Sequence, residues 1–394
     1  MTGHAEESRR SEQQPDATGA ASPTTGTTGT ATPAEAPAGT SAPAEATTGT
    51  ADGTATRPRP RSARTARTAP RPRRTRHGIS PWVPNQHGAW PMLVAGPVVG
   101  IAWAAVLLGV MAADDRAPGL HGTAGTVIVL VAAVVAWFAG YFAFFAAGIW
   151  LRAKAPAKRA AALRPTLLYG AVALVGVVVA LLLQPHLLWW AIPVAAASAV
   201  AVGETWRGTP RSVISGVATV VLCAVTVPAL ASTGIGAARA VAEGVTWGAG
   251  ASGPFTTAVV EGLPAAVWVA AVWSVLYNTG TILYVKTMIR EKGNRAFLAV
   301  SVGYHALMLV AVVATGWVRG VPTATVVVMA IVAAAALARS VLVPRAAARA
   351  AAGVWTPKAV GRREMPLVLG TLVACLLTAV LYGGENIYPA SVIE

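Results

Sequence analysis

The sequence predicts an all-α membrane protein, a polytopic bundle of about nine transmembrane helices that follows a disordered N-terminal tail. Nine apolar stretches without a charged residue lie between Gly88 and the C-terminus. Each is long enough to approach the roughly 20 residues that a helix needs to cross a bilayer core about 30 Å thick. Hydrophobic residues make up 55% of the chain and charged residues 12%, which is too apolar for 394 residues to bury in one soluble core. Since an open strand leaves backbone groups unpaired in lipid, the spans must be helices.

The chain is expected to divide into a tail, residues 1–80, and a transmembrane helical domain, residues 81–394. Alanine, threonine, proline and glycine dominate the tail up to about Thr56, a composition that buries too little apolar surface to offset the cost of ordering. No apolar export-signal core precedes Trp82, so we expect the tail to be retained. The arginines between Arg57 and Arg76 either set the topology as a solvated charge run or lie along an anionic membrane surface. Nucleic acid is not an expected partner, because no aromatic interleaving or folded basic module accompanies them.

The nine expected spans are separated by short polar segments. They are Gly88–Val110, Gly125–Leu151, Leu167–Leu183, Leu187–Val202, Val213–Ala231, Pro264–Val285, Phe297–Gly316, Thr323–Ala338 and Pro366–Leu381. The third and fourth spans are short and are joined only by Gln184, Pro185 and His186, where proline favours a tight break. Reading them as one long helix would reverse the topology of everything that follows.

The charge pattern supports nine spans and gives the orientation. With the tail inside, 17 basic residues fall in the inner segments and three, Arg116, Arg239 and Arg319, in the outer ones. Cytoplasmic loops carry such an excess of lysine and arginine, so the N-terminus is expected in the cytoplasm and the C-terminus outside. Abundant alanine, glycine and proline, with arginine well above lysine, are typical of a GC-rich bacterial genome. We therefore expect a multi-pass protein of a bacterial plasma membrane.

Several absences narrow the chemistry. No aspartate or glutamate falls inside an expected span, which disfavours proton-coupled or cation-coupled carriers and magnesium-dependent diphosphate chemistry. The sequence has no Walker loop, HExxH motif, nucleophile elbow or dinucleotide fingerprint. Its two cysteines, Cys223 and Cys375, both fall inside spans and indicate neither a disulfide nor a metal site. No metal and no cofactor is predicted.

One expected outer segment is long. Residues Ser232–Leu263 are too polar and glycine-rich to form a span, and Ala237–Trp247 could form a short surface helix. The segment could be a lid over an external cavity or a plain interfacial loop.

Polar residues concentrate where the first span enters from the cytoplasmic side. Gln86 and His87 lie at an expected helix N-terminus, where free N–H groups and the positive dipole end favour an anion, and Trp90 suits the headgroup level. The alternative is an interfacial cap. Gly96 and Gly100 share one helix face and are expected to allow close helix packing.

The end of the sixth span holds the densest group of candidate residues. Lys286 and Arg290 are one helical turn apart and repel by roughly 0.2–0.5 kcal/mol unless an anion lies between them. A ligand phosphate or carboxylate could provide that charge, and so could a phospholipid headgroup. Deeper in the span are Tyr277, Asn278 and Thr281. Asn278 and Thr281 face one side and are expected to contact another helix or a bound molecule, because an unpaired amide in lipid is costly.

His305 lies about eight residues into the seventh span, roughly 12 Å deep at 1.5 Å per residue. It could be a neutral, hydrogen-bonded packing residue, or it could contact a ligand or transfer a proton.

Two segments carry a resemblance to a known family. Pro84–Pro97, which reads PNQHGAWPMLVAGP, and Leu283–His305, which reads LYVKTMIREKGNRAFLAVSVGYH, resemble the YwiC-like family of bacterial membrane proteins over the region from about Pro81 onward. The resemblance implies a membrane location and architecture without implying a reaction.

A weaker, architectural resemblance is to the UbiA-type prenyltransferases, which have nine helices and active-site segments after the second and sixth spans. The basic segments Arg152–Arg164 and Lys286–Arg295 occupy those two places. The Asp-rich motifs with which those enzymes hold magnesium and diphosphate are missing from this chain.

Three hypotheses about function follow. In the first, the cytoplasmic mouth binds or transports an anionic small molecule or lipid. In the second, the protein is a metal-independent lipid- or isoprenoid-modifying enzyme on a UbiA-like bundle, with His87 or His305 as acid or base. In the third, it is a structural partner of a membrane complex. The candidate ligand-binding residues are Gln86, His87, Trp90, Arg152, Arg164, Tyr277, Asn278, Lys286, Arg290 and His305. The expected partners are the lipid bilayer, anionic lipid headgroups and an anionic small-molecule ligand, and the sequence indicates no oligomeric state.

Overall fold

The computed structural model describes residues 80–84, 89–113, 119–242, 262–350 and 354–387. All of them belong to one compact unit, Thr75–Glu394. The expectations for the tail, for the entry segment 85–88 and for most of the long outer segment lie outside the described residues. The division at residue 80 therefore stays a prediction.

The described residues confirm an all-α bundle in which nine helices are long and apolar enough to cross a membrane. Two short 3-10 helices, η1 and η2, accompany them. The elements are α1 (Trp90–Ala113), α2 (Gly119–Arg152), α3 (Pro156–Leu183), η1 (Pro185–Trp190), α4 (Ala191–Trp206), α5 (Val213–Ala242), α7 (Ala265–Ile289), α8 (Arg295–Ala314), η2 (Thr315–Trp317), α9 (Thr323–Arg349) and α10 (Pro357–Ile387).

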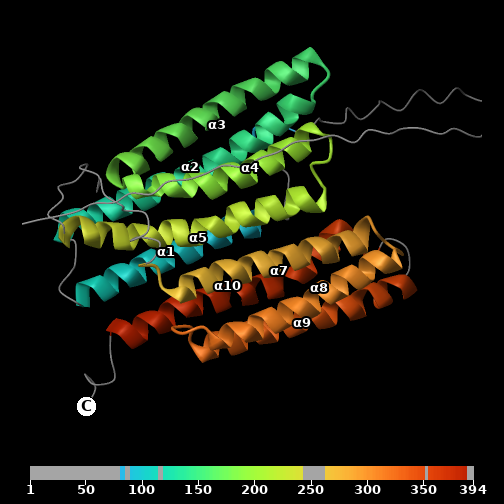
Figure 1. Ribbon diagram of the computed structural model, residues 1–394. Coiled ribbons are helices and arrows are strands. Elements are labelled where there is room, and N and C mark those ends of the chain that lie inside the picture. The colour runs from blue at the N-terminus through green and yellow to red at the C-terminus, as the bar shows by residue number, and fades with distance from the viewer. Residues whose placement is uncertain (1–79, 85–88, 114–118, 243–261, 351–353, 388–394) are drawn as a thin grey trace, which may run out of the picture. The chain divides into compact units, whose positions relative to one another are not determined.

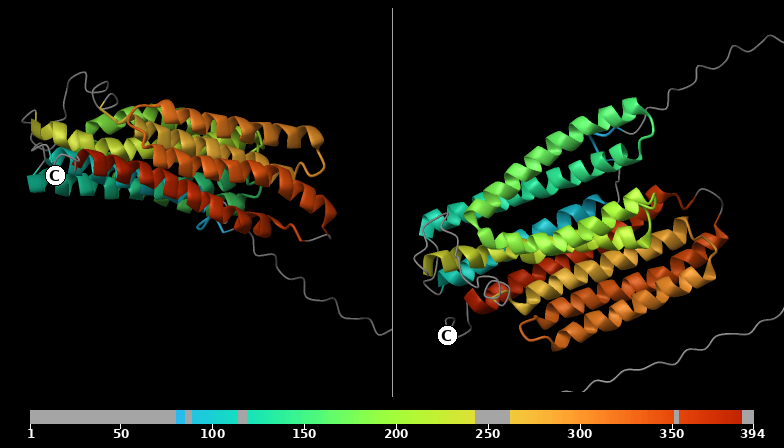
Figure 2. Two further views of the ribbon diagram at one scale, coloured as in Figure 1. Left: turned by 90° about the horizontal axis from the view of Figure 1, so that it is seen from below. Right: turned by 45° about the horizontal axis from the view of Figure 1, so that its top comes forward.

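The helices run up and down beside one another, as Figures 1 and 2 show. Helix α1 packs against α5 and α10, and α5 in turn packs against α4 and α7. The α2–α3 hairpin joins this group mainly through α2, which contacts α5, while α8 and α9 pack together beside α7 and α10. Chain neighbours are therefore mostly spatial neighbours, as short connections between antiparallel helices require.

Helices α1 and α5 pack closely, and the glycines of α1 meet the backbone of α5. A Cβ atom on Gly96 would lie 2.2 Å from the carbonyl oxygen of Cys223, and one on Gly100 would lie 2.7 Å from that of Thr226. Such an approach is open only to a residue without a side chain. The prediction that Gly96 and Gly100 allow close packing is confirmed.

Large apolar side chains fill the centre of the bundle, and others cover its outside. Trp103, Trp273 and Met329 are fully buried in the main core. In contrast, Leu174 and Leu182 on α3 are 63% and 65% exposed. Exposed leucine on this scale is expected where lipid, rather than water, covers the surface.

The break between the third and fourth spans is confirmed, because η1 separates α3 from α4. Other boundaries differ from the expectation. Helix α3 begins at Pro156 rather than Leu167, and α5 continues to Ala242, so that Ala237–Ala242 continues α5 beyond the span Val213–Gly236 instead of starting a surface helix. Helix α9 likewise continues to Arg349.

Helix α10 begins at Pro357 rather than Pro366, and this changes a conclusion about charge. Glu364 lies inside α10, and Glu204 lies inside the span formed by η1 and α4. The expectation that no span contains a carboxylate is therefore wrong. For Glu364 the reason is length: α10 has 31 residues and extends about 46 Å, beyond a core of about 30 Å. Its polar turns reach the headgroup level without ending the helix.

Candidate functional site: a basic end and a buried ion pair

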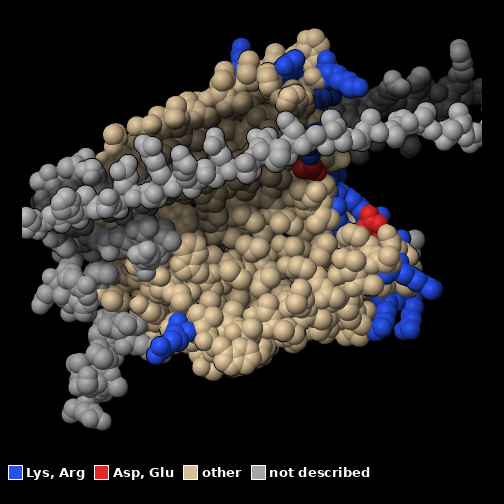
Figure 3. Space-filling view, viewed as in Figure 1, with Lys and Arg blue, Asp and Glu red and all other residues tan. Residues whose placement is uncertain are grey.

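Lysine and arginine gather at one end of the helices, visible at the right of Figure 3. We call this the basic end. It comprises the ends of α2, α4, α7 and α9, the starts of α3, α5, α8 and α10, and the segments that connect them. Its described basic residues are Arg152, Lys154, Lys158, Arg159, Arg164, Arg207, Arg211, Lys286, Arg290, Lys292, Arg295, Arg345, Arg349, Lys358, Arg362 and Arg363. Arg319 lies at the opposite end, between η2 and α9.

Of the three candidates at the entry to the first span, the structure describes one. Gln86 and His87 lie outside the described residues. Trp90 begins α1, and its ring meets those of Tyr141 and Phe142 edge-on, with centroids 6.2 Å and 5.9 Å away. This contact fixes the start of α1 against the middle of α2.

Arg152 and Arg164 are both exposed. The Nε of Arg152 donates to the carbonyl of Gly148 in its own helix at 2.7 Å. Arg164 lies within α3 rather than in a loop, because that helix begins at Pro156. Among the described residues no contact joins either arginine to Lys286 or Arg290, so the structure does not bring the two expected basic segments together.

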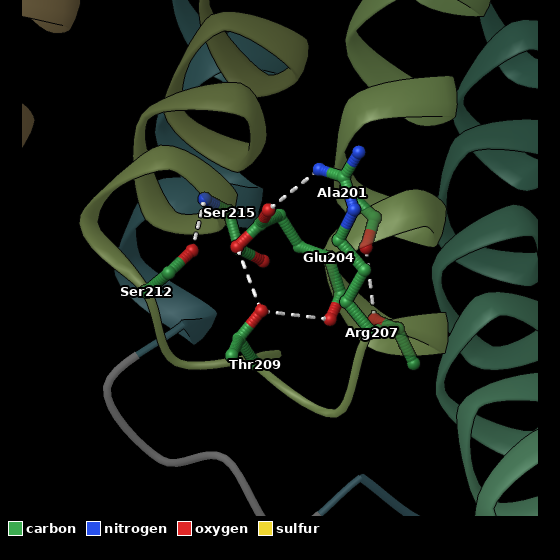
Figure 4. Close-up of polar contacts among 7 residues, drawn as sticks. Ala201, Glu204, Arg207, Thr209, Ser212 and Ser215 are labelled. Carbon is green, nitrogen blue, oxygen red and sulfur yellow. Dashed lines mark hydrogen bonds and ion pairs between the residues drawn. The ribbon is translucent and has the colours of Figure 1, made fainter. Parts of the chain in front are cut away.

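The loop between α4 and α5 is held in shape by Glu204, as Figure 4 shows. Its Oε2 accepts a hydrogen bond from the hydroxyl of Thr209 at 2.9 Å, and its Oε1 accepts one from Arg207 at 3.4 Å. The hydroxyl of Ser212 accepts from the backbone N–H of Ser215 and so caps the first turn of α5. Glu204, to which the sequence analysis assigned no role, thus orders the α4–α5 loop at the basic end.

That loop is joined to the end of α7. The Nη1 of Arg290 donates to the carbonyl of Arg211 at 3.0 Å. Lys286, one helical turn before Arg290, is partly buried. The contact brings the two basic segments of the α4–α5 loop and α7 side by side.

A buried ion pair lies deeper, where α7, α9 and α10 meet. The Nη1 of Arg339 donates to Oε2 of Glu364, and the side chains of the pair are only 10% and 6% exposed. The other oxygen, Oε1, accepts from the hydroxyl of Tyr277 at 2.6 Å and from that of Thr281 at 2.9 Å. The ring of Tyr284 covers one face of the guanidinium, 4.0 Å from Cζ.

Sequence reasoning missed Arg339 and Glu364 as site residues, although it identified Tyr277. Both were assigned to an inner connecting segment. A signal was present: Arg339 directly follows an apolar run of sixteen expected span residues, Thr323–Ala338, and ionisable residues at such positions mark functional or pairing sites. The expectation that Thr281 contacts another helix fits its bond to Glu364 on α10.

Asn278 and Tyr277 line a small crevice between α1, α7 and α10. Its other walls are largely apolar and include Met92, Val99 and Leu372. The space measures about 20 Å³, enough for one water molecule, which needs roughly 10–15 Å³. The amide of Asn278 donates to the carbonyl of Ser274 in its own helix at 2.8 Å.

His305 is fully buried in α8, at 1% exposure. Its Nδ1 lies 2.7 Å from the carbonyl of Ser301. A Cβ atom on Gly280 of α7 would lie 3.1 Å from its Nε2, so the imidazole occupies the space beside that glycine. This geometry suits a hydrogen-bonded packing histidine between α7 and α8.

Part of the chain matches a known protein family. Residues 83–231 match the model of a family described as YwiC-like protein. The resemblance stated from Pro84–Pro97 is thereby confirmed, and the YwiC-like region extends from the entry of the first span into α5. Leu283–His305, the second segment that carried the resemblance, lies beyond the matched residues, as does the Arg339–Glu364 pair. No curated protein and no solved structure matches the chain.

The UbiA-type resemblance therefore stays a prediction. Within the described residues, no three histidine, cysteine, aspartate or glutamate side chains are grouped so that they could hold a metal ion.

Proposed function

We propose that this YwiC-like membrane protein binds an anionic group, either of a lipid headgroup or of a small molecule, at its basic end. The observation that carries the proposal is the uncompensated charge there. Among the described residues, Arg207 is the one exposed cation of this end with a carboxylate partner, Glu204. Exposed cations beside a membrane attract anionic headgroups by about 1 kcal/mol each.

The junction of α7 with the α4–α5 loop is the best local candidate for the anion. Lys286 and Arg290 are one turn apart on α7, and Arg290 is anchored on the backbone of Arg211. Two like charges at that spacing favour an anion between them. Because Arg290 is anchored on that loop, the group would bind to a preformed surface rather than order two free side chains.

The basic end is proposed to face the cytoplasm of a bacterial cell, because lysine and arginine accumulate on that side of multi-pass proteins. The inner leaflet carries anionic lipid. The basic residues would therefore both set the orientation of the protein in the membrane and lie beside an anionic ligand. We favour binding over a lipid-modifying reaction. The modifying enzyme would need His305 as an acid or base, and the contacts of His305 with Ser301 and Gly280 indicate a packing residue instead.

The test is native mass spectrometry of the full chain released from its own membrane in mild detergent. The parent is compared with Lys286→Ala/Arg290→Ala. The matched control is Lys154→Ala/Lys158→Ala, which removes two exposed cations of the same end, one between α2 and α3 and one in the first turn of α3.

The expected result is an anionic lipid or metabolite retained by the parent and the control and lost from the α7 variant. Equal retention by all three proteins would overturn the α7 site. A parent that carries no anionic molecule would overturn the proposed function. That result would favour a structural partner of a membrane complex, and the next step would be to identify co-purifying proteins.

A further inference from the structure

The guanidinium of Arg339 is buried, and at least three of its five N–H donors are unused. Nη1 is paired with Glu364, but Nε and Nη2 are buried and have no hydrogen-bond partner among the described residues. A guanidinium does not lose its proton in a protein, so deprotonation cannot remove the unpaired N–H donors. Leaving donors of a charged group buried and unpaired is among the costlier defects in a fold.

The two free nitrogens form one edge of the planar group. The edge made by Nε and Nη2 can pair with both oxygens of a carboxylate or phosphate at once. Glu364 does not use it, because its Oε1 is taken by Tyr277 and Thr281. The network around Glu364 thus fixes the guanidinium in place and leaves its Nε–Nη2 edge buried without a hydrogen-bond partner.

The charge around the pair favours an anion at that edge. Arg339 and Glu364 neutralise each other, so a second negative group needs further positive charge nearby. Arg363 directly precedes Glu364, and its guanidinium lies over the ring of Trp355, 4.1 Å from the centroid. Lys286 lies near the end of α7, two residues after Tyr284. Among the described residues neither cation forms a close ion pair with a carboxylate, although Lys286 interacts electrostatically with Glu291.

A thin apolar layer separates Arg339 from the basic end. Tyr284, Met288, Ala347 and Val360 form a small buried cluster, distinct from the main core, across the ends of α7 and α9 and the start of α10. Ala347 is eight residues beyond Arg339 in α9, so the layer is about 12 Å thick at most along the helix. Tyr284 in this layer covers one face of the Arg339 guanidinium.

We propose that the Nε–Nη2 edge of Arg339 is an inner binding site for a two-oxygen anionic group, a carboxylate or a phosphate. It rests on the proposed function, since the basic end would attract the same group. The bound group would belong either to a lipid headgroup or to a free small anion. Arg339 is the contact that selects it, because a bidentate fork recognises planar paired oxygens, which a surface lysine does not.

The experiment measures thermal unfolding of the full chain in detergent by tryptophan fluorescence. Inorganic phosphate or acetate is added at constant ionic strength against sodium chloride, and retained phospholipid is measured by native mass spectrometry. Arg339→Lys keeps the charge and the pair with Glu364 but removes the fork. Arg319→Lys, at the opposite end, is the matched control.

We expect a ligand that stabilises the parent and the Arg319→Lys protein and binds Arg339→Lys at least about tenfold more weakly, the effect of losing one hydrogen bond to a charged group. Phosphate or acetate as that ligand indicates a free anion, and a retained phospholipid indicates a headgroup. Unchanged binding by Arg339→Lys, with the Lys286→Ala/Arg290→Ala effect intact, would overturn the inner site and leave the proposed function standing. Absence of any anionic ligand from the parent would overturn both.

A second variant decides the matter if Arg339→Lys does not fold. Glu364→Gln keeps the shape of the side chain but removes the negative charge that competes for Arg339. The affinity for the anion is expected to rise in this variant. An unchanged or lower affinity would overturn the inner site and would indicate that Nε and Nη2 bind water only.

Discussion

The close contact between α1 and α5 gives the sharpest test of the packing. In Gly96→Ala the new Cβ would lie 2.2 Å from the carbonyl oxygen of Cys223 and from the hydroxyl oxygen of Thr226. The first of these is a backbone atom and cannot rotate away. Since Cβ atoms essentially never approach closer than 3.0 Å, the two helices must separate by about 1 Å, which forfeits a quarter to a half of the attraction between the facing atoms.

Overpacking of this kind costs about 1–3 kcal/mol, and a backbone clash places Gly96→Ala toward the upper part of that range. In Gly100→Ala the nearest atoms lie at 2.7 Å and 2.8 Å, so a smaller cost is expected. Gly170→Ala in α3 is the matched control, because its Cβ would meet no atom within 4 Å. It should leave the free energy of unfolding unchanged or raise it by up to about 1 kcal/mol, because alanine favours a helix interior more than glycine does.

The assay is unfolding of the full chain by sodium dodecyl sulfate in mixed micelles, followed by tryptophan fluorescence. The midpoints are expected in the order Gly170→Ala, Gly100→Ala, Gly96→Ala, from the highest detergent fraction to the lowest. If Gly96→Ala unfolds together with Gly170→Ala, the close approach of α1 and α5 is wrong.

Two further predictions concern the ends of α4 and α5. In Gly236→Ala the Cβ would lie 2.5 Å from the imidazole of His186. The variant should therefore lose the 3.1 Å contact between His186 and Ser232 and unfold at a lower detergent fraction than the parent. The control Gly203→Ala, whose Cβ would meet no atom within 4 Å, should unfold at the same detergent fraction as the parent or a higher one. Glu204→Ala removes the acceptor that holds Thr209, and trypsin should then cleave the α4–α5 loop several-fold faster in a time course. Equal cleavage of parent and variant would show that Glu204 does not order this loop.

The sequence by itself determined the class and the number of spans. A helix that crosses a bilayer must be long, apolar and closed in its own hydrogen bonds, and each of these requirements is local to one segment. The same locality explains why the break at Pro185 and the small residues Gly96 and Gly100 could be interpreted correctly. The orientation, inferred from the basic segments, stays a prediction.

Only the tertiary structure decided which polar residues meet. Glu364 pairs with Arg339, and that pairing depends on how α9 and α10 pack rather than on either segment alone. Helix ends were also beyond reach, because a helix continues into the headgroup region at little cost, so hydropathy falls before the helix stops. For that reason the sequence placed Glu364 outside the last span, whereas the packed bundle places it among Tyr277, Thr281 and Arg339.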